Sequence, residues 1–365
     1  MELNSNFTAQ DQRFGRALRL LRDAIAAGAF PGCSLAVVHG GELVACQGLG
    51  RFTYEPQSPE VTADTIFDVA SLTKIVATTT MAMILYQRGL LDLDLPVESV
   101  VREFAGRDRD NDPRRPQVTI RSLLAHTSGL PAYVRLFEQA RTRDELALAA
   151  CRTPLEAGPG ERTAYSDIGF IVLGEALARL ADESLDSFCH REIFGPLGMS
   201  RTCFNPPTEM RPIIPPSEDD RRFRQRIMQG EVNDENAFVM GGVAGHAGLF
   251  SSAPDLARFA AAMLRGGVIV RAQTLAVFAQ AHPAKSGSPR ALGFDLPSVP
   301  SQSGRHFSPR ALGHLGFTGT SLWLDRERDL AIALLSNRTW PDRSSQEIKR
   351  VRPLVHDAIV EALTS

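Results

Sequence analysis

A serine and a lysine three positions apart give the sequence its first sign of chemistry. Ser71 and Lys74 stand in the run Ser-Leu-Thr-Lys, just before an apolar stretch that begins at Ile75. On a helix, residues i and i+3 share one face, with Cβ atoms ~5–6 Å apart. A serine hydroxyl is a weak nucleophile until a base takes its proton, and a lysine can be that base when burial or nearby positive charge lowers its pKa. The pair therefore predicts covalent catalysis by Ser71, with Lys74 as its activator.

The scarcity of lysine supports this interpretation. The chain holds only three lysines, at positions 74, 285 and 349, among 40 residues of the Lys and Arg types. Arginine cannot be deprotonated in proteins, whereas lysine can, so a rare lysine is expected where a proton must move. The four-residue motif by itself also fits a surface lysine that follows a helix N-cap serine. The prediction therefore depends on further motifs.

Three later segments supply those motifs. Tyr165-Ser166-Asp167 precedes a helix that we expect to begin near Ile168. The run from Gly313 to Gly319 contains His-Leu-Gly and leads into a predicted strand. The glycine-rich run GGVAGHAGLF precedes a helix that begins at Ser252, with Pro254 tolerated in its first turn.

In this order the motifs resemble those of the serine β-lactamase and penicillin-binding protein superfamily. The closest resemblance is to its class C β-lactamase-like branch, which also contains D-Ala-D-Ala peptidases and esterases. That family carries S-x-x-K, then Y-x-N, then K-T-G or H-x-G. The resemblance extends from about Gly32 to Asn337, and GGVAGHAGLF is similar to a subgroup that includes penicillin-binding proteins of carboxypeptidase type. The matching positions are Ser71 with Lys74, Tyr165 with Asp167, and His314 with Gly316.

The resemblance implies a role for each of these residues. Ser71 would attack an amide or ester carbonyl and carry the acyl group, while Lys74 would hold or take its proton. Tyr165 would act between Ser71 and the leaving group, first as base and then as acid. The backbone N–H groups of Ser71 and Phe317 would form the oxyanion hole, where losing one donor typically costs ~10²–10³ in rate. His314 would face the substrate, and no cofactor is implied.

Two positions depart from the family pattern. Asp167 replaces the asparagine of Y-x-N, so an acceptor-only carboxylate replaces an amide. An anion beside Lys74 would favour the ammonium form of the lysine, and we therefore predict that Tyr165 is the working base. His314 with Leu315 replaces Lys-Thr, which removes a permanent charge and a hydroxyl that grip the substrate carboxylate in β-lactamases. This change favours esterase or peptidase activity over efficient β-lactam hydrolysis.

The elements that must position these residues come first from the two ends of the chain. Apolar residues at helical spacing predict a helix over 11–27, and the strands around Gly40-Gly41 predict a hairpin over 33–46. A second hairpin over 321–335 and a helix over 344–363 close the chain.

The middle of the chain has a different character. Helical patterns joined by Gly/Pro loops fill 71–204, and 205–230 predicts a long surface loop. A chain of 365 residues exceeds the ~250–300 over which a single core keeps growing. We therefore predict an α+β fold, an α/β sandwich of the β-lactamase/transpeptidase-like type, in which helices from both chain ends flank an antiparallel sheet. The predicted division is a sheet domain (1–70 plus 240–365) and a mostly helical domain (71–239), with the active site in the cleft between them.

Charge and composition exclude several partners. A net charge of −2 gives no electrostatic reason to expect nucleic acid. The run from Glu218 to Arg222 changes from acidic to basic residues, which indicates a solvated, self-neutralising surface. No apolar run reaches the ~20 residues that span a bilayer, and no signal peptide is visible. As the sequence stands this predicts a cytoplasmic protein, or a periplasmic one if a leader preceded it.

The remaining histidines and cysteines favour structural roles. His126 ends a predicted short helix and is expected to satisfy backbone groups there, and His246 in GGVAGHAGLF is expected to be structural near the cleft. The other histidines do not cluster, which argues against a metal site. The five cysteines have no CxxC spacing, which predicts free thiols; they are Cys33, Cys46, Cys151, Cys189 and Cys203.

Two functions of different classes fit these features. One is a serine acyl hydrolase acting on a small-molecule substrate: a β-lactam, a D-Ala-D-Ala-type peptide or a small ester. The other is a non-catalytic, penicillin-binding-like sensor or binding module. The intact set of Ser71, Lys74 and Tyr165 favours the enzyme. An α/β-hydrolase is disfavoured because no G-x-S-x-G motif is present. Substrate class and oligomeric state do not follow from the sequence.

Overall fold

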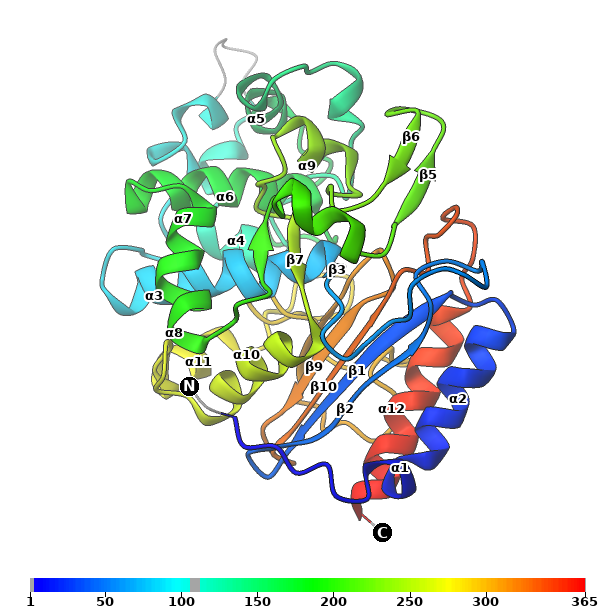
Figure 1. The fold of residues 1–365 in the computed structure, drawn as a ribbon. Coiled ribbons are helices and arrows are strands. Elements are labelled where there is room, and N and C mark those ends of the chain that lie inside the picture. The colour runs from blue at the N-terminus through cyan, green and yellow to red at the C-terminus, as the bar shows by residue number, and fades with distance from the viewer. Residues whose placement is uncertain (1–2, 106–111, 365) are drawn as a thin grey trace.

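A five-stranded antiparallel sheet forms from the two ends of the chain (Figure 1). The computed structural model describes residues 3–105 and 112–364. β1 pairs with β10 from Cys33–Ser336 to His39–Leu330, so the first and last strands lie side by side in the middle of the sheet. In spatial order the strands are β2 (Glu42–Gly50), β1 (Gly32–His39), β10 (Leu330–Ser336), β9 (Ser321–Asp325) and β8 (Leu312–Leu315).

Both predicted hairpins are present, and their turns have clear physical causes. Gly40 and Gly41 join β1 to β2 with φ values of 57° and 77°, which a tight two-residue hairpin turn requires. The turn between β9 and β10 is organised by the buried Asp325, whose Oδ1 accepts the N–H groups of Glu327 and Arg328 at 3.1 and 3.3 Å.

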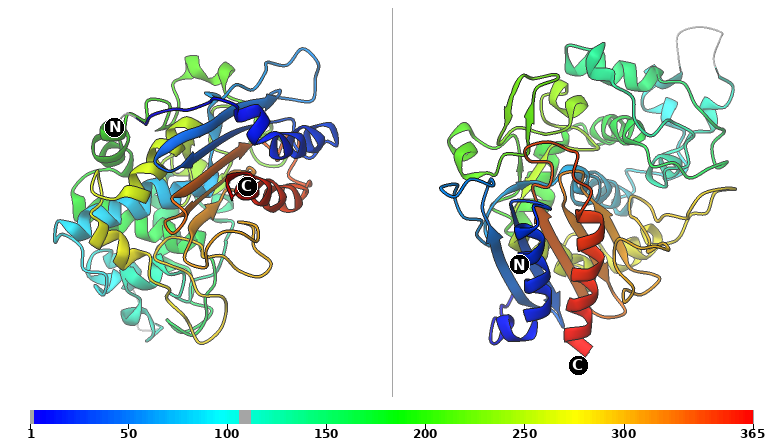
Figure 2. Two further views of the ribbon diagram at one scale, coloured as in Figure 1. Left: turned by 90° about the horizontal axis from the view of Figure 1, so that it is seen from below. Right: turned by 90° about the vertical axis from the view of Figure 1, so that its right-hand side faces the viewer.

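Helices lie on both faces of the large sheet (Figure 2). Alternate residues of the central strands bury against these opposite layers, as the period of two in a strand requires. Leu35 and Val37 of β1 belong to a cluster with α2 (Gly15–Ala26) and α12 (Ile348–Thr364). Ala36 and Val38 belong to the cluster on the other face, where α10 (Ala253–Arg265) packs on β1, β9 and β10. The predicted α+β architecture is therefore confirmed.

The two terminal helices differ from their predicted bounds. The helix expected over 11–27 is split at Phe14 into α1 (Gln10–Arg13) and α2. The last helix begins at Ile348, four residues later than expected. The helix predicted from Ser252 is present as α10, and the Ser252 side chain caps it by accepting the Asp255 N–H at 3.4 Å.

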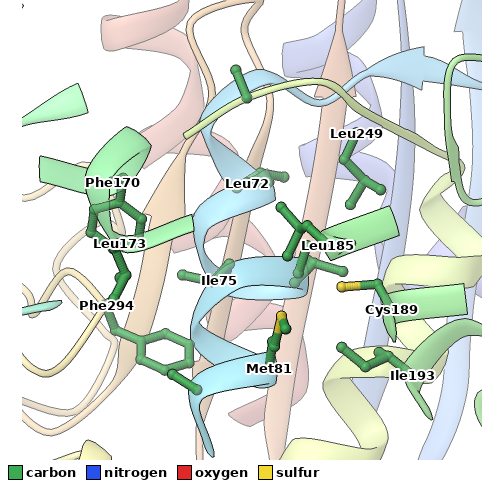
Figure 3. Close-up of a cluster of buried hydrophobic side chains, with 14 of the residues drawn as sticks. Leu72, Ile75, Met81, Phe170, Leu173, Leu185, Cys189, Ile193, Leu249 and Phe294 are labelled. Carbon is green, nitrogen blue, oxygen red and sulfur yellow. The ribbon is translucent and has the colours of Figure 1, made fainter. Parts of the chain in front are cut away.

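The region between the sheet strands is mostly helical. Its buried centre is the segment from Leu72 through α3 (Thr80–Gln87), which Figure 3 shows surrounded by apolar side chains from several elements. A small sheet joins this region to the large one, with β3 (Phe67–Asp68) and β4 (Cys203–Phe204) on either side of β7 (Leu249–Ser251). The other helices are α4 (Ile120–Leu124), α5 (Arg143–Arg152), α6 (Asp167–Ala181), α7 (Leu185–Cys189), α8 (Gly195–Leu197), α9 (Glu235–Val239) and α11 (Ala272–Phe278).

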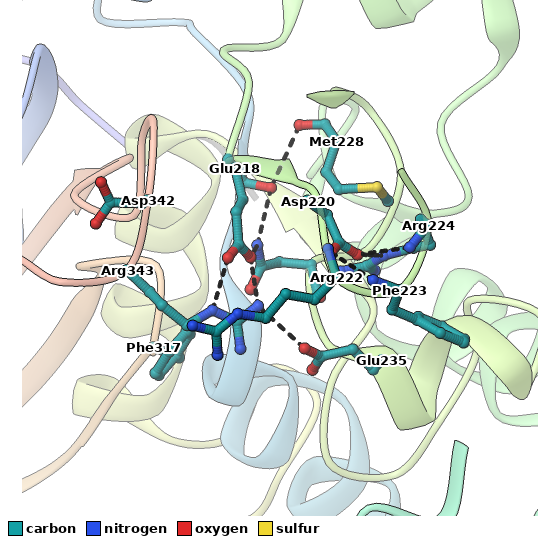
Figure 4. A network of polar contacts seen from close by, with 12 residues as sticks. Glu218, Asp220, Arg222, Phe223, Arg224, Met228, Glu235, Phe317, Asp342 and Arg343 are labelled. Atoms are coloured by element: carbon teal, nitrogen blue, oxygen red, sulfur yellow. Dashed lines mark hydrogen bonds and ion pairs between the residues drawn. The ribbon is translucent and has the colours of Figure 1, made fainter. Parts of the chain in front are cut away.

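The predicted surface loop over 205–230 holds more structure than expected. It contains a 3₁₀ helix (Thr208–Ile213) and a hairpin of β5 (Glu218–Asp220) with β6 (Arg226–Met228). The expectation of a solvated acidic run was wrong for Glu218 and Asp220, which are 7% and 5% exposed. Figure 4 shows the cause: both carboxylates act as hydrogen-bond acceptors for neighbouring groups.

The Asp220 carboxylate accepts the backbone N–H groups of Arg222, Phe223 and Arg224 and pairs with the Arg224 guanidinium at 2.6 Å. Burial opposes ionisation, but these bonds hold the pKa of Asp220 well below its usual range. A buried carboxylate whose lone pairs are filled in this way stabilises a turn instead of solvating a surface.

The predicted division into two domains stays a prediction. The larger apolar cluster runs without a break from Ala36 in the sheet into the helical region. α11, which lies in the C-terminal part of the sequence, packs against α3 of the helical part. No helix among the described residues is long and apolar enough to cross a membrane.

Candidate active site

Ser71 directly follows a residue with a strained backbone conformation. It lies in a 3₁₀ turn, Ala70–Leu72, that leads into a π-helical turn, Lys74–Thr79. Ala70 has φ of +48°, a region that a residue with a Cβ enters at a cost of ~1–3 kcal/mol. Asp68 holds this conformation, because its Oδ1 accepts the Ala70 N–H at 2.8 Å.

Asp68 itself is buried and joins Ser71's loop to the segment before α9. Its second oxygen accepts the Asn233 N–H at 2.7 Å. Burial raises the pKa of Asp68 to about 6, against the opposing effect of its two backbone hydrogen bonds. Asp68 was not singled out from the sequence, since an isolated acidic residue carries no motif.

Lys74 is fully buried, and its Nζ has three partners from three parts of the chain. It lies 2.9 Å from Ser71 Oγ, 2.7 Å from Asp167 Oδ1 and 2.9 Å from the backbone oxygen of His246. An ammonium can donate to all three. A neutral amine can donate to Asp167 and to the carbonyl while its lone pair accepts the Ser71 proton. The same geometry therefore serves both protonation states.

Tyr165 completes the contacts of the Ser71 oxygen. Its hydroxyl donates to Ser71 Oγ at 2.8 Å. Tyr165 directly precedes Ser166, the N-cap of α6, whose side chain accepts the Gly169 N–H at 2.9 Å. The start of α6 thus places Tyr165 and Asp167 on either side of the cap.

His126 supports this capped turn from behind. Its Nδ1 accepts the Ser166 N–H at 2.9 Å, and its ring lies 4.8 Å from the Tyr165 ring and 4.9 Å from that of Phe170. The expectation that His126 satisfies a backbone group is confirmed.

Burial shifts the pKa values of the two candidate bases in opposite directions. It lowers the pKa of Lys74, although the neighbouring Asp167 carboxylate acts to raise it. Burial raises the pKa of Tyr165 well above its usual value, and the charge of Asp167 adds to this. A buried amine is easier to keep neutral and a buried phenol harder to ionise. These directions favour Lys74 as the proton acceptor and Tyr165 as a neutral donor, opposite to the expectation from sequence.

The reason for this difference is the complete burial of Lys74. The charge of Asp167 is visible in the sequence, whereas the removal of Lys74 from water is a property of the folded chain. Desolvation is the larger of the two effects.

The turn after β8 brings the backbone N–H of Phe317 close to the loop that carries Ser71. The hydroxyl of Thr320 donates to Val69 O at 3.0 Å, and that of Thr318 donates to Asp68 O at 2.7 Å. A Cβ on Gly316 would lie 1.9 Å from Thr320 Oγ1 and 2.6 Å from Val69 O. Gly316 is therefore needed for this close approach and is not itself a ligand.

Two backbone donors are left without partners at this junction. Across the described ranges, neither the Ser71 N–H nor the Phe317 N–H makes a hydrogen bond. Unfilled N–H groups beside a nucleophile are what an oxyanion requires.

His314 is a buried, neutral ring. Its Nδ1 donates to the backbone oxygen of Leu315 at 2.8 Å, since a carbonyl can only accept. Burial, together with the charges of Lys74 and Arg290, holds the pKa of His314 well below its usual value. Its Nε2 is thus a buried acceptor, without a partner among the described residues. The expectation that His314 faces substrate stays a prediction.

The glycine-rich segment before β7 positions the backbone carbonyl of His246 beside Lys74. A Cβ on Gly245 would lie 2.1 Å from Phe170 O, so only glycine lets this loop pack directly on α6. That contact brings the His246 carbonyl to Lys74. The His246 ring is anchored separately, with Nε2 2.8 Å from Asp234. Burial would raise the pKa of Asp234, but His246 and a backbone hydrogen bond lower it to about 2.

The structure adds Asp68, Asp234 and Arg290 to the residues chosen from sequence. Arg290 lies in an irregular loop, and its guanidinium Cζ is 5.3 Å from the centre of the Tyr165 ring. No group of three His, Cys, Asp or Glu side chains among the described residues is placed to hold a metal ion. All five cysteines are free thiols.

Comparisons with known proteins agree with this arrangement. The family model described as Beta-lactamase matches residues 17–356. An N-acetylmuramyl-L-alanine amidase of Bacillus subtilis (strain 168) is 31% identical, over 88% of this chain and 80% of the relative. A putative D-alanyl-D-alanine carboxypeptidase of Escherichia coli (strain K12) is 29% identical, over 85% of this chain and 79% of the relative.

Among solved structures, EstCE1, a hydrolase with promiscuous acyltransferase activity, is similar in fold. It has a TM-score of 0.78 at 20% identity, over 96% of this chain and 99% of its own. The family match spans nearly the whole chain and contains every residue of the Ser71 site. The chain therefore belongs to the beta-lactamase family, in the serine β-lactamase and penicillin-binding protein superfamily, and is a serine hydrolase.

Proposed function

We propose that the protein forms an acyl-enzyme on Ser71 and cleaves amide or ester bonds of small molecules. One observation carries this proposal: Ser71 Oγ lies 2.9 Å from Lys74 Nζ and 2.8 Å from the Tyr165 hydroxyl. A single oxygen thus has a proton acceptor on one side and a proton donor on the other. The unfilled N–H groups of Ser71 and Phe317 support the same reaction, because acyl transfer develops negative charge on the carbonyl oxygen.

In the proposed acylation, neutral Lys74 takes the Ser71 proton as Oγ bonds to the substrate carbonyl carbon. The bond from that carbon to the leaving group then breaks. Tyr165 gives its proton to the departing oxygen or nitrogen and is left as a phenolate, while Lys74 is left as an ammonium.

Deacylation restores both groups. The Tyr165 phenolate takes a proton from water as the water oxygen bonds to the acyl carbon. The bond from that carbon to Ser71 Oγ breaks, and Lys74 returns its proton to Ser71. Each proton is thus accounted for within one turnover by residues already in contact with Ser71.

We further propose amides of the D-Ala-D-Ala peptide type as the leading substrates, with small esters next. The relatives named as a carboxypeptidase and an amidase support amide substrates. The neutral state of His314 offers no permanent charge to a substrate carboxylate, and this supports small esters without a carboxylate over β-lactams.

A fluorophosphonate probe tests the nucleophile, and three substrates test the specificity. We expect the wild type to be labelled and Ser71→Ala not to be. Values of kcat/KM are then compared for a D-Ala-D-Ala peptide, a p-nitrophenyl ester and nitrocefin, with nitrocefin expected to be lowest. Labelling that persists in Ser71→Ala would remove Ser71 from the reaction. No labelling and no turnover would support the non-catalytic sensor.

A further inference from the structure

Arg290 brings a second buried cation to the Tyr165 ring. Its Cζ lies 5.3 Å from the ring centre, and Lys74 Nζ lies 4.9 Å from the same point. Only 18% of the Arg290 side chain is exposed. A cation over an aromatic ring interacts more strongly when it is desolvated than at the surface. The Tyr165 ring therefore lies near Arg290 and, once Lys74 has taken the Ser71 proton, near a second cation that water screens poorly.

The fold ties Arg290 to the strand that carries His314. The Arg290 backbone oxygen accepts the His282 N–H at 2.8 Å, and its guanidinium pairs with Asp295. Asp295 in turn exchanges two backbone hydrogen bonds with Gly313, at 2.7 and 3.0 Å. Gly313 directly precedes His314 in β8. Arg290 is thus held by a backbone hydrogen bond to His282 and by an ion pair with Asp295, which is itself anchored to β8.

His314 leaves the Tyr165 site without a permanent charge from β8. Its ring lies 5.7 Å from the Tyr165 ring and is neutral. The guanidinium of Arg290 stays protonated, since its pKa is lowered by burial only to about 10. The permanent cation near Tyr165 therefore comes from the loop before β8 instead of from the strand.

We propose that Arg290 is a positioning residue that stabilises negative charge on the Tyr165 oxygen while Tyr165 protonates the leaving group. This inference rests on the proposed function. A cation near the phenol ring lowers the energy of the phenolate, and the charge of Arg290, 5.3 Å from the ring centre, acts to lower the pKa of Tyr165. Arg290 would thus make Tyr165 a stronger acid at the moment when the bond to the leaving group breaks. Arg290 itself exchanges no proton in this step.

The proposal predicts that the effect of Arg290 depends on the leaving group. A p-nitrophenolate departs without a proton, whereas a methoxide or an amide nitrogen needs one. For two esters with the same acyl group, Arg290→Met should lower kcat/KM ~10–100-fold for the methyl ester and less than ~3-fold for the p-nitrophenyl ester. The larger loss is a part of the ~10²–10⁴ that general acid catalysis typically contributes. Arg290→Lys, which keeps the charge, should recover most of the loss.

The control is Arg88→Met, because Arg88 Cζ also lies over an aromatic ring, that of Phe188 at 5.9 Å, far from Ser71 in the fold. This variant should leave both kcat/KM values unchanged. Thermal unfolding of each variant checks that the protein is folded. If Arg290→Met does not fold, Asp295→Asn is compared instead. Removing this counter-charge should raise the ratio of kcat/KM for the methyl ester to kcat/KM for the p-nitrophenyl ester. A fall in this ratio, or no change, would overturn the proposal.

Three other outcomes would overturn the proposal. Equal losses for both esters in folded Arg290→Met would overturn the proposal and leave a purely structural role. A loss confined to substrates that bear a carboxylate would also overturn it, because Arg290 would then bind substrate. In both cases the wild type remains active and the proposed function stands. A wild type that turns over no ester or amide would overturn both.

Discussion

Lys74 Nζ lies 2.7 Å from Asp167 Oδ1, in a site where Lys74 is fully buried. Burial disfavours the ammonium and Asp167 favours it, and the balance lowers the pKa of Lys74. The carboxylate at this position, where the superfamily has an amide, therefore limits how far the pKa of Lys74 falls without holding the lysine permanently charged.

Asp167→Asn should move the acidic limb of the pH profile to lower pH. Asp167 raises the pKa of Lys74, so removing its charge lets the neutral amine persist at lower pH. The measurement is kcat/KM against pH with a p-nitrophenyl ester. Asp94→Asn, at an exposed ion pair with Arg121, is the matched control and should leave the limb in place. A limb that stays fixed or moves upward in Asp167→Asn would contradict the role given to Lys74.

Tyr165→Phe should separate acylation from turnover. If Lys74 is the base, a p-nitrophenyl ester still acylates Ser71, because p-nitrophenolate needs no proton. In the wild type, Tyr165 then gives its own proton to solvent and accepts one from the attacking water, so deacylation without Tyr165 loses its base and slows by ~10²–10⁴. Stopped-flow measurements should then show a burst of p-nitrophenol followed by slow turnover. Loss of the burst itself would show that Tyr165, and not Lys74, activates Ser71.

Gly316→Ala should damage catalysis through backbone geometry. A Cβ at this position would lie 1.9 Å from Thr320 Oγ1, so the turn must shift and carry the Phe317 N–H with it. We expect kcat/KM to fall by ~10²–10³, the typical effect of losing one oxyanion donor. Gly15→Ala is the control, since its Cβ would meet nothing closer than 3.5 Å. A folded Gly316→Ala with wild-type kinetics would exclude Phe317 from the oxyanion hole.

Asp68 should make the stability of the protein depend on pH. Burial raises the pKa of Asp68 in the folded protein to about 6, above the usual aspartate value of ~3.9, so the folded state binds the extra proton. The stability that this proton contributes is fully present below pH ~4 and is lost as pH rises through ~6. The free energy of unfolding of wild type minus that of Asp68→Asn should be larger at pH 4.5 than at pH 7 by about 2 kcal/mol. Urea unfolding of both proteins at the two pH values measures this difference, and the opposite sign would refute the assignment.

Motifs with strong local signals could be recognised without the structure. Ser71 and Lys74 at helical spacing, the turn at Gly40-Gly41 and the cap at Ser252 all depend on contacts between near neighbours in the chain. Such contacts follow from residue type and spacing, and the order of the motifs along the chain then indicated the family and its α+β fold.

Contacts between distant segments depended on the tertiary structure. The carbonyl of His246 meets Lys74 across 172 positions, and Arg290 reaches Tyr165 from a loop without periodicity. The sequence also misjudged Glu218 and Asp220 as solvated, because charge pattern does not report which N–H groups a carboxylate accepts.

Ser71 and Lys74 show which properties follow from the sequence and which follow from the fold. The sequence by itself determined that Ser71 and Lys74 share one turn, and through their companions it determined the family. The tertiary structure adds the burial that favours Lys74 over Tyr165 as the proton acceptor in the proposed reaction. That choice depends on how far Lys74 and Tyr165 are removed from water, and burial is a property of the assembled chain and not of spacing within it.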